Sequence, residues 1–135
     1  MFTINICSHF SAAHRLDGYN GSCANVHGHN WKVRLSLECK KTDSIGMTID
    51  FKVLKKQFEK ILSDFDHKYL NDLEVFSNNN PTSEFIAKII FEKASTLLNN
   101  SNCEVKEVEV WESEKYSVVY SADETYISSS RHKGE

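Results

Sequence analysis

Apolar and polar residues alternate along two segments near the N-terminus of this 135-residue chain. From Phe2 to His14 the even-numbered positions are mostly apolar, and from His29 to Cys39 the alternation is stricter. Side chains two positions apart lie on the same face of a β-strand, so each segment predicts a strand that is covered on one side only. Residues 17–22, between the two segments, are rich in turn-forming residues, so we expect a long hairpin with an elaborated loop.

Two segments in the middle of the chain have the apolar spacing of amphipathic helices. In the first, Asp50 is a candidate N-cap, and the stripe that follows is Phe51, Leu54, Phe58, Ile61, Leu62 and Phe65. In the second, Asn80 and Pro81 are of the types favoured at an N-cap and at the first helical position. Its stripe is Phe85, Ile86, Ile89, Ile90, Ala94, Leu97 and Leu98. The polar residues 63–72 are expected to end the first helix.

Two further strands are expected over residues 104–111 and 116–120, where β-branched and aromatic residues are frequent. The predicted order is strand, strand, helix, helix, strand, strand. This order indicates an α+β fold, in which a four-stranded antiparallel sheet carries both helices on one face. We expect a single domain over residues 1–122 and a polar C-terminal extension over residues 123–135.

The composition excludes several classes of function. The 16 basic and 19 acidic residues give a net charge of −3, so no broad cationic field for nucleic acid or an anionic membrane is expected. No N-terminal signal and no apolar stretch of membrane-spanning length is present, so a soluble, cytoplasmic protein is expected. The four cysteines are scattered without a Cys-x-x-Cys pair, which favours reduced thiols.

Three histidines are candidate metal ligands. His27 and His29 lie two positions apart and therefore share a face, and His14 could join them from a paired strand. Three neutral imidazoles and one open position form the ligand set of a catalytic zinc ion, whereas a structural zinc ion is more often closed by a fourth protein ligand. The nearby Cys23 is therefore ambiguous. The alternative is that the three histidines are unrelated and are satisfied by backbone hydrogen bonds.

Six blocks of residues, in order along the chain, resemble the 6-pyruvoyltetrahydropterin synthase family. They are Phe10 to Leu16, Cys23 with His27 to Asn30, Gly46 to Phe51, Asp66 to Asn71, Asn80 to Glu84, and Glu112. The resemblance implies the T-fold, with the element order ββααββ, and sheets that join between subunits into a barrel. It also implies a homo-hexamer of two stacked trimers with sites between subunits, so that Asp66 and His67 would serve the Cys23 of a neighbour.

The short spacing between Cys23 and His27 is similar to that of the bacterial branch that makes 6-carboxytetrahydropterin for queuosine. The resemblance therefore implies a zinc-dependent lyase that cleaves 7,8-dihydroneopterin triphosphate to 6-carboxytetrahydropterin, acetaldehyde and triphosphate. One alternative is the 6-pyruvoyl product. The other is a catalytically silent module that binds pterin or zinc.

By resemblance, His14, His27 and His29 bind zinc, and Cys23 is the base that removes a proton from carbon. Asp66 and His67 look like a second proton-transfer pair, although an Asp-His pair is also ordinary at a helix end. Glu112 would pair with the amino-pyrimidine edge of the pterin, or be one more solvent-facing strand glutamate like Glu107 and Glu109. By strand parity Glu112 would sit opposite to those two. Thr82, Ser83 and Glu84 would line the same pocket, but helix capping explains Thr82 and Ser83 nearly as well. No residue is assigned to the triphosphate.

Overall fold

The computed structural model describes residues 1–122, and the predicted extension over residues 123–135 lies outside the described part. Four long elements carry the fold: strands β1 (Phe2–His14) and β2 (His27–Cys39), and helices α1 (Phe51–Leu62) and α2 (Ser83–Leu98). They are completed by strands β3 (Lys68–Tyr69), β4 (Cys103–Trp111) and β5 (Ser117–Tyr120) and by the 3-10 turns η1 (Ser22–Ala24), η2 (Leu70–Asp72) and η3 (Glu74–Phe76). The order confirms the predicted α+β class.

The sheet has the strand order β3-β1-β2-β4-β5. Its long pairs are antiparallel, as predicted, and β1 pairs with β2 along the whole length of both strands. The predicted four-stranded antiparallel sheet is nevertheless wrong in one respect. Residues 68–69, expected at the polar end of the first helix, form the edge strand β3, which runs parallel to β1 and makes the sheet mixed.

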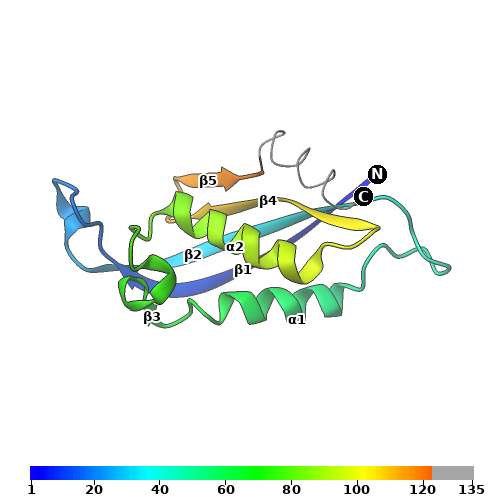
Figure 1. Ribbon diagram of the computed structural model, residues 1–135, viewed down its shortest axis with the longest axis horizontal. Helices are drawn as coiled ribbons and strands as arrows, with labels where there is room; N and C mark the ends of the chain where they lie inside the picture. The colour runs from blue at the N-terminus through cyan, green and yellow to red at the C-terminus, as the bar shows by residue number, and fades with distance from the viewer. Residues whose placement is uncertain (123–135) are drawn as a thin grey trace.

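Both helices pack on one face of the sheet, α1 against β1 and α2 against β4 and β5 (Figure 1). The core lies between these two layers. Phe10, Trp31, Val33, Leu35 and Leu37 project into it from the strands, as the alternation predicted, and Leu54, Phe58, Ile86 and Ile90 from the helices. Phe51, the first residue of the predicted α1 stripe, is exposed instead.

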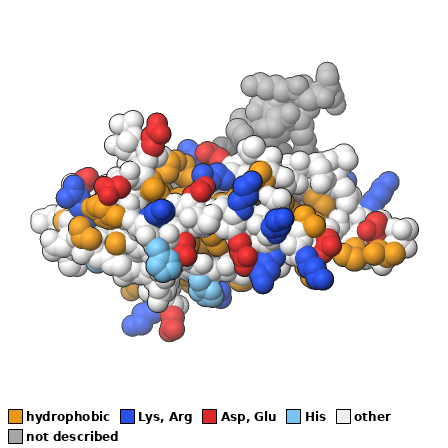
Figure 2. Space-filling model, turned by 90° about the horizontal axis from the view of Figure 1, so that it is seen from below, with side chains coloured by type: hydrophobic (Ala, Val, Ile, Leu, Met, Phe, Trp, Pro, Cys, Tyr) orange, Lys and Arg blue, Asp and Glu red, His pale blue; other side chains and the backbone are white. Residues whose placement is uncertain are grey.

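The face of the sheet away from the helices carries a network of polar side chains. Arg34 bonds to Glu107 and Glu109 at 3.0 Å each and also contacts Asn5 and the buried Ser36. On the face drawn in Figure 2, basic and acidic side chains are interspersed. Among the described residues, no helix is both long and apolar enough to cross a membrane.

Two local predictions are corrected by the structure. The N-cap of α2 is Thr82, whose hydroxyl accepts from the Phe85 N–H, and not Asn80. Asp50 caps α1 as predicted.

The cysteines are not all reduced. Cys39 and Cys103 lie opposite one another in the β2–β4 register and form a disulfide, while Cys7 and Cys23 are free thiols.

Candidate metal centre

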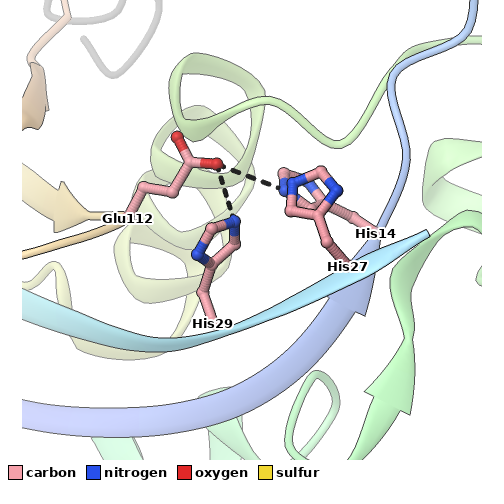
Figure 3. Close-up of side chains that lie close together, drawn as sticks. All are labelled: His14, His27, His29 and Glu112. Atoms are coloured by element: carbon pink, nitrogen blue, oxygen red, sulfur yellow. Dashed lines mark ion pairs between the residues drawn. The ribbon is translucent and has the colours of Figure 1, made fainter. Parts of the chain in front are cut away.

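The three histidines come together at one end of the β1–β2 hairpin. His14, the last residue of β1, pairs with His27, the first residue of β2, and His29 shares a face of β2 with His27. The ring centroids lie 4.5 to 5.2 Å apart. Figure 3 shows that the rings gather on one side of the hairpin, facing Glu112, the residue that follows β4.

A carboxylate oxygen of Glu112 completes this group. Its Oε1 atom lies 2.9 Å from Nε2 of His29 and 3.3 Å from Nε2 of His14. The potential ligand atoms of His14, His27, His29 and Glu112 all lie within 4.8 Å of one another. Zinc forms bonds of about 2.0–2.2 Å with nitrogen and oxygen. Small rotations of these side chains would bring their ligand atoms to that distance from one shared ion.

Hydrogen bonds on the far side of two rings determine which nitrogen faces the group. Nδ1 of His14 donates to the carbonyl oxygen of Pro81 at 2.8 Å, and Nδ1 of His27 donates to that of Asn25 at 2.7 Å. A carbonyl oxygen can only accept, so Nδ1 carries a proton in each ring, and the neutral tautomer of each presents the Nε2 lone pair to the group. Metal-binding histidines are oriented in the same way.

Two buried nitrogen atoms test whether this group fits a cation. Nε2 of His14 and Nε2 of His29 are buried and have no hydrogen-bond partner of standard geometry, although Oε1 of Glu112 lies within ion-pair distance of both. A lone pair of His14 that faces a carboxylate oxygen is repelled unless a positive charge lies between them. A divalent metal ion supplies that charge, so the residues fit a metal.

Burial favours the neutral form of His29. Desolvation lowers the pKa of His29, Glu112 opposes this shift, and His14 and His27 reinforce it. A neutral ring can bind a metal without first losing a proton. The lowered pKa of His29 therefore also fits a metal ligand.

A pocket of about 200 Å³ opens beside the group, and its walls include His14 and Glu112. Thr82, Ser83 and Glu84, at the start of α2, line the same pocket. The structure thus brings all four predicted substrate-binding residues to one cavity next to a histidine. The capping alternative also holds for Thr82, because its hydroxyl oxygen accepts from the Phe85 N–H at 3.1 Å.

Cys23 lies in the η1 turn, partly buried. Its carbonyl oxygen accepts from the N–H of Leu16, which also lines the pocket. Among the described residues, the potential metal ligands grouped around the histidines do not include the Cys23 sulfur. The arrangement therefore favours a role for this thiol other than that of a fourth ligand.

Asp66 and His67 are held by the backbone of β1. Asp66 accepts from the Ser11 N–H at 2.9 Å, and the His67 N–H donates to the Ser11 carbonyl at 2.6 Å. The backbone of His67 has a φ of 58°. Its Nδ1 atom lies 2.9 Å from Oδ2 of Asp66, and the His67 side chain is 83% exposed. The Ser11 N–H, and then His67, lower the pKa of Asp66. Within the described chain, no hydrogen bond or ion pair of this pair reaches Cys23 or the histidines.

The place of Glu112 against the histidines was not predicted from the sequence. Strand parity predicted that it would face opposite to Glu107 and Glu109. Those two bond to Arg34 on the outer face, whereas Glu112 faces the histidines. The carbonyl groups of Pro81 and Asn25 were missed altogether, because backbone acceptors leave no trace in residue types.

The fold and the site together define a small α+β protein with a candidate metal-binding group of three histidines and a glutamate beside a pocket. The sequence profile of the family described as 6-pyruvoyl tetrahydropterin synthase matches residues 3–123. The chain belongs to this family.

Relatives with different names resemble the chain. A 6-carboxy-5,6,7,8-tetrahydropterin synthase of Bacillus subtilis is 35% identical over 111 residues, covering 76% of this chain and 74% of the relative. One from Synechocystis is 42% identical over 89 residues, covering 62% and 67%. The solved structure of a 6-pyruvoyl tetrahydropterin synthase from Caenorhabditis elegans has a TM-score of 0.80 and 31% identity, covering 90% of this chain and 96% of that one.

Proposed function

We propose that this protein is a 6-carboxy-5,6,7,8-tetrahydropterin synthase that uses zinc. It would convert 7,8-dihydroneopterin triphosphate to 6-carboxytetrahydropterin, acetaldehyde and triphosphate, in queuosine biosynthesis. The observation that carries the proposal is the convergence of His14, His27 and His29 beside a pocket that Glu112 also lines. The names of the Bacillus and Synechocystis relatives support the 6-carboxy product.

His14, His27 and His29 would hold the zinc ion through Nε2. When bound, zinc would act as a Lewis acid toward the hydroxyl groups of the substrate side chain. The Pro81 and Asn25 carbonyls keep the first two rings in the required tautomer. Because the Cys23 sulfur lies outside the ligand group, the thiol is left for a second role, that of the base that removes a proton from carbon.

Glu112 would accept two N–H donors of the amino-pyrimidine edge through its two carboxylate oxygens. Thr82, Ser83 and Glu84 form the wall of the same pocket. One oxygen of Glu112 faces the histidines at 2.9 and 3.3 Å, so the carboxylate must turn away from them to form both bonds to the pterin. Glu112 would therefore exchange a contact with the metal centre for a contact with substrate.

Asp66 and His67 would complete the site of a neighbouring subunit. The His67 side chain is 83% exposed, and its Nδ1 lies beside Asp66, which leaves Nε2 available to exchange a proton outside its own chain. Within residues 1–122, β3 and β5 are the edge strands of the sheet, and each has a strand partner on one side only. Joining such edges into a barrel, in a homo-hexamer of two trimers, would satisfy them and bring His67 to another subunit's Cys23.

Product analysis tests the proposal. Zinc-loaded protein is incubated with 7,8-dihydroneopterin triphosphate, and the products are identified by mass spectrometry. We expect 6-carboxytetrahydropterin together with acetaldehyde. A 6-pyruvoyl product without acetaldehyde would assign the chain to the activity named for the Caenorhabditis structure, and pterin binding without turnover would indicate a silent module.

A further inference from the structure

Two asparagines of the family-like blocks, Asn71 and Asn80, have no role in the proposed chemistry, yet both make a double contact with the backbone. Asn71 accepts from the N–H of Arg15 at 2.9 Å and donates to its carbonyl oxygen at 3.0 Å. Asn80 does the same to Asp17, at 2.9 and 2.8 Å. We call this arrangement, in which one side-chain amide bonds both backbone groups of a single residue, an amide clamp.

The clamped segment connects two parts of the site. It begins directly after His14 and leads toward the turn that carries Cys23. Leu16, between the clamped residues, donates its N–H to the Cys23 carbonyl at 2.9 Å. Three successive residues after His14 are therefore held in place, although none of them belongs to a helix or strand.

The Asn80 clamp has a second connection to the metal centre. The next residue, Pro81, supplies the carbonyl oxygen that accepts from Nδ1 of His14 at 2.8 Å. One dipeptide thus holds both the imidazole ring of His14 and the backbone three residues after it. A shift of this dipeptide would move the ring and the clamped segment together.

We infer that Asn71 and Asn80 are positioning residues of the metal site, which set the place of His14 and of the Cys23 turn through the backbone of Arg15 and Asp17. The side-chain hydrogen bonds of both amides go to Arg15 and Asp17 and not to a residue of the histidine group. The inference rests on the proposed metal site. It extends that site to residues that touch neither metal nor substrate.

The chain contains a matched control at the other end of the sheet. Asn102 clamps Lys41 in the same way, with both bonds at 2.9 Å. All three asparagines are partly buried. Lys41 follows β2 at its Cys39 end, and a strand of 13 residues spans roughly 40 Å at about 3.3 Å per residue. Asn102→Ala therefore removes the same two backbone hydrogen bonds, together with a weak 3.7 Å contact to Cys103 Sγ, far from the histidines.

The test compares Asn71→Ala, Asn80→Ala and Asn102→Ala in the full-length chain. Zn²⁺ affinity is measured by chelator competition, the Co²⁺ site by its visible absorption spectrum, and stability by thermal unfolding of metal-free protein. Each variant is expected to lose roughly 3–8 °C in Tm, because each loses two hydrogen bonds. Only the Asn71 and Asn80 variants are expected to bind Zn²⁺ about tenfold more weakly and to alter the Co²⁺ spectrum.

Asn71→Asp and Asn80→Asp provide a second measurement if an alanine variant does not fold. Aspartate keeps the acceptor for the backbone N–H and loses the donor. Its added negative charge would by itself favour cation binding, so weaker Zn²⁺ binding in these variants also supports the inference. Wild-type Zn²⁺ affinity in the Asn71 and Asn80 variants, or an equal loss in Asn102→Ala, would overturn it. A wild-type chain that binds no Zn²⁺ would overturn the proposed function as well.

Discussion

The two ends of the β1–β2 hairpin share one backbone pattern and differ in what closes them. At one end, His14 pairs with His27, and buried imidazole nitrogens lie beside a carboxylate without a hydrogen bond. At the other end, a disulfide between buried residues ties Cys39 to Cys103 of β4. Unsatisfied polar atoms cost stability, whereas the covalent link adds it. The proposed metal site and the stabilising disulfide thus lie at opposite ends of the hairpin. Removing the disulfide should leave Zn²⁺ binding unchanged, and removing a histidine should leave the disulfide intact.

The largest expected effect is the loss of the metal. His29→Ala removes one of the three proposed imidazole ligands, so bound zinc should fall from about one ion per chain to background and product formation should cease. The fold should persist, since the His29 side chain is 23% exposed and lies at a strand end. Metal analysis by mass spectrometry and circular dichroism measure the two quantities. Full zinc occupancy in this variant would remove His29 from the ligand set.

The second expected effect separates the thiol from the metal. Cys23→Ala should lower kcat roughly 10²–10⁴-fold, as expected for loss of a general base, and should retain zinc, because the Cys23 sulfur lies outside the ligand group. Cys7→Ala is the matched control, because Cys7 is the other free cysteine. Normal turnover by Cys23→Ala would exclude the thiol as the base, and loss of zinc would make it a ligand.

The third expected effect belongs to the opposite end. Replacing both Cys39 and Cys103 by alanine opens a covalent loop with a sequence separation of 64. The free energy of unfolding in urea should fall by about 2–4 kcal/mol, and Zn²⁺ affinity should not change. Reducing agent should lower the stability of the wild type and have no effect on the double variant. Weaker Zn²⁺ binding in the double variant would show that the two ends are coupled.

Periodicity was sufficient to predict the long elements, because each strand and helix of the core buries one regular face. Periodicity failed for elements too short to show a pattern and for contacts between residues far apart in the chain. β3 has only two residues, too few for a pattern, and its partner Ala12 lies more than 50 positions away in the chain. Cys39 and Cys103 meet only through the β2–β4 register.

In the candidate site, too, the regular strand pattern was predictable and the isolated contacts were not. Strand parity placed His27 and His29 on one face, and the structure brings both beside His14. Strand parity gave the face of Glu112, but no pattern reports that its carboxylate lies against the histidines, because that contact depends on how β4 packs beside β2. The start of α2 was misplaced for a related reason, because the amide of Asn80 is engaged by Asp17 and Thr82 caps the helix instead.

The smallest expected effect concerns pH and the pair outside the histidine group. The Ser11 N–H holds the pKa of Asp66 below its ordinary value of 3.8. Folding therefore favours the ionised carboxylate. Its contribution to stability is complete above the unfolded-state pKa and is lost as the pH falls through the lower pKa of the folded protein. Asp66→Asn should remove this dependence, so the stability difference from wild type should shrink as the pH is lowered below 3.8.

Urea unfolding of wild type and Asp66→Asn between pH 2 and pH 7 measures that difference. Asp64→Asn is the control. The Asp64 carboxylate lies in the same loop but contacts Lys93 rather than a backbone N–H. If the Asp66 and Asp64 variants follow the same pH dependence, the Ser11 contact does not select the ionised form. A carboxylate that stays ionised near neutral pH accepts no proton there, so a specific Asp66 effect would leave His67 as the member of the pair that exchanges a proton.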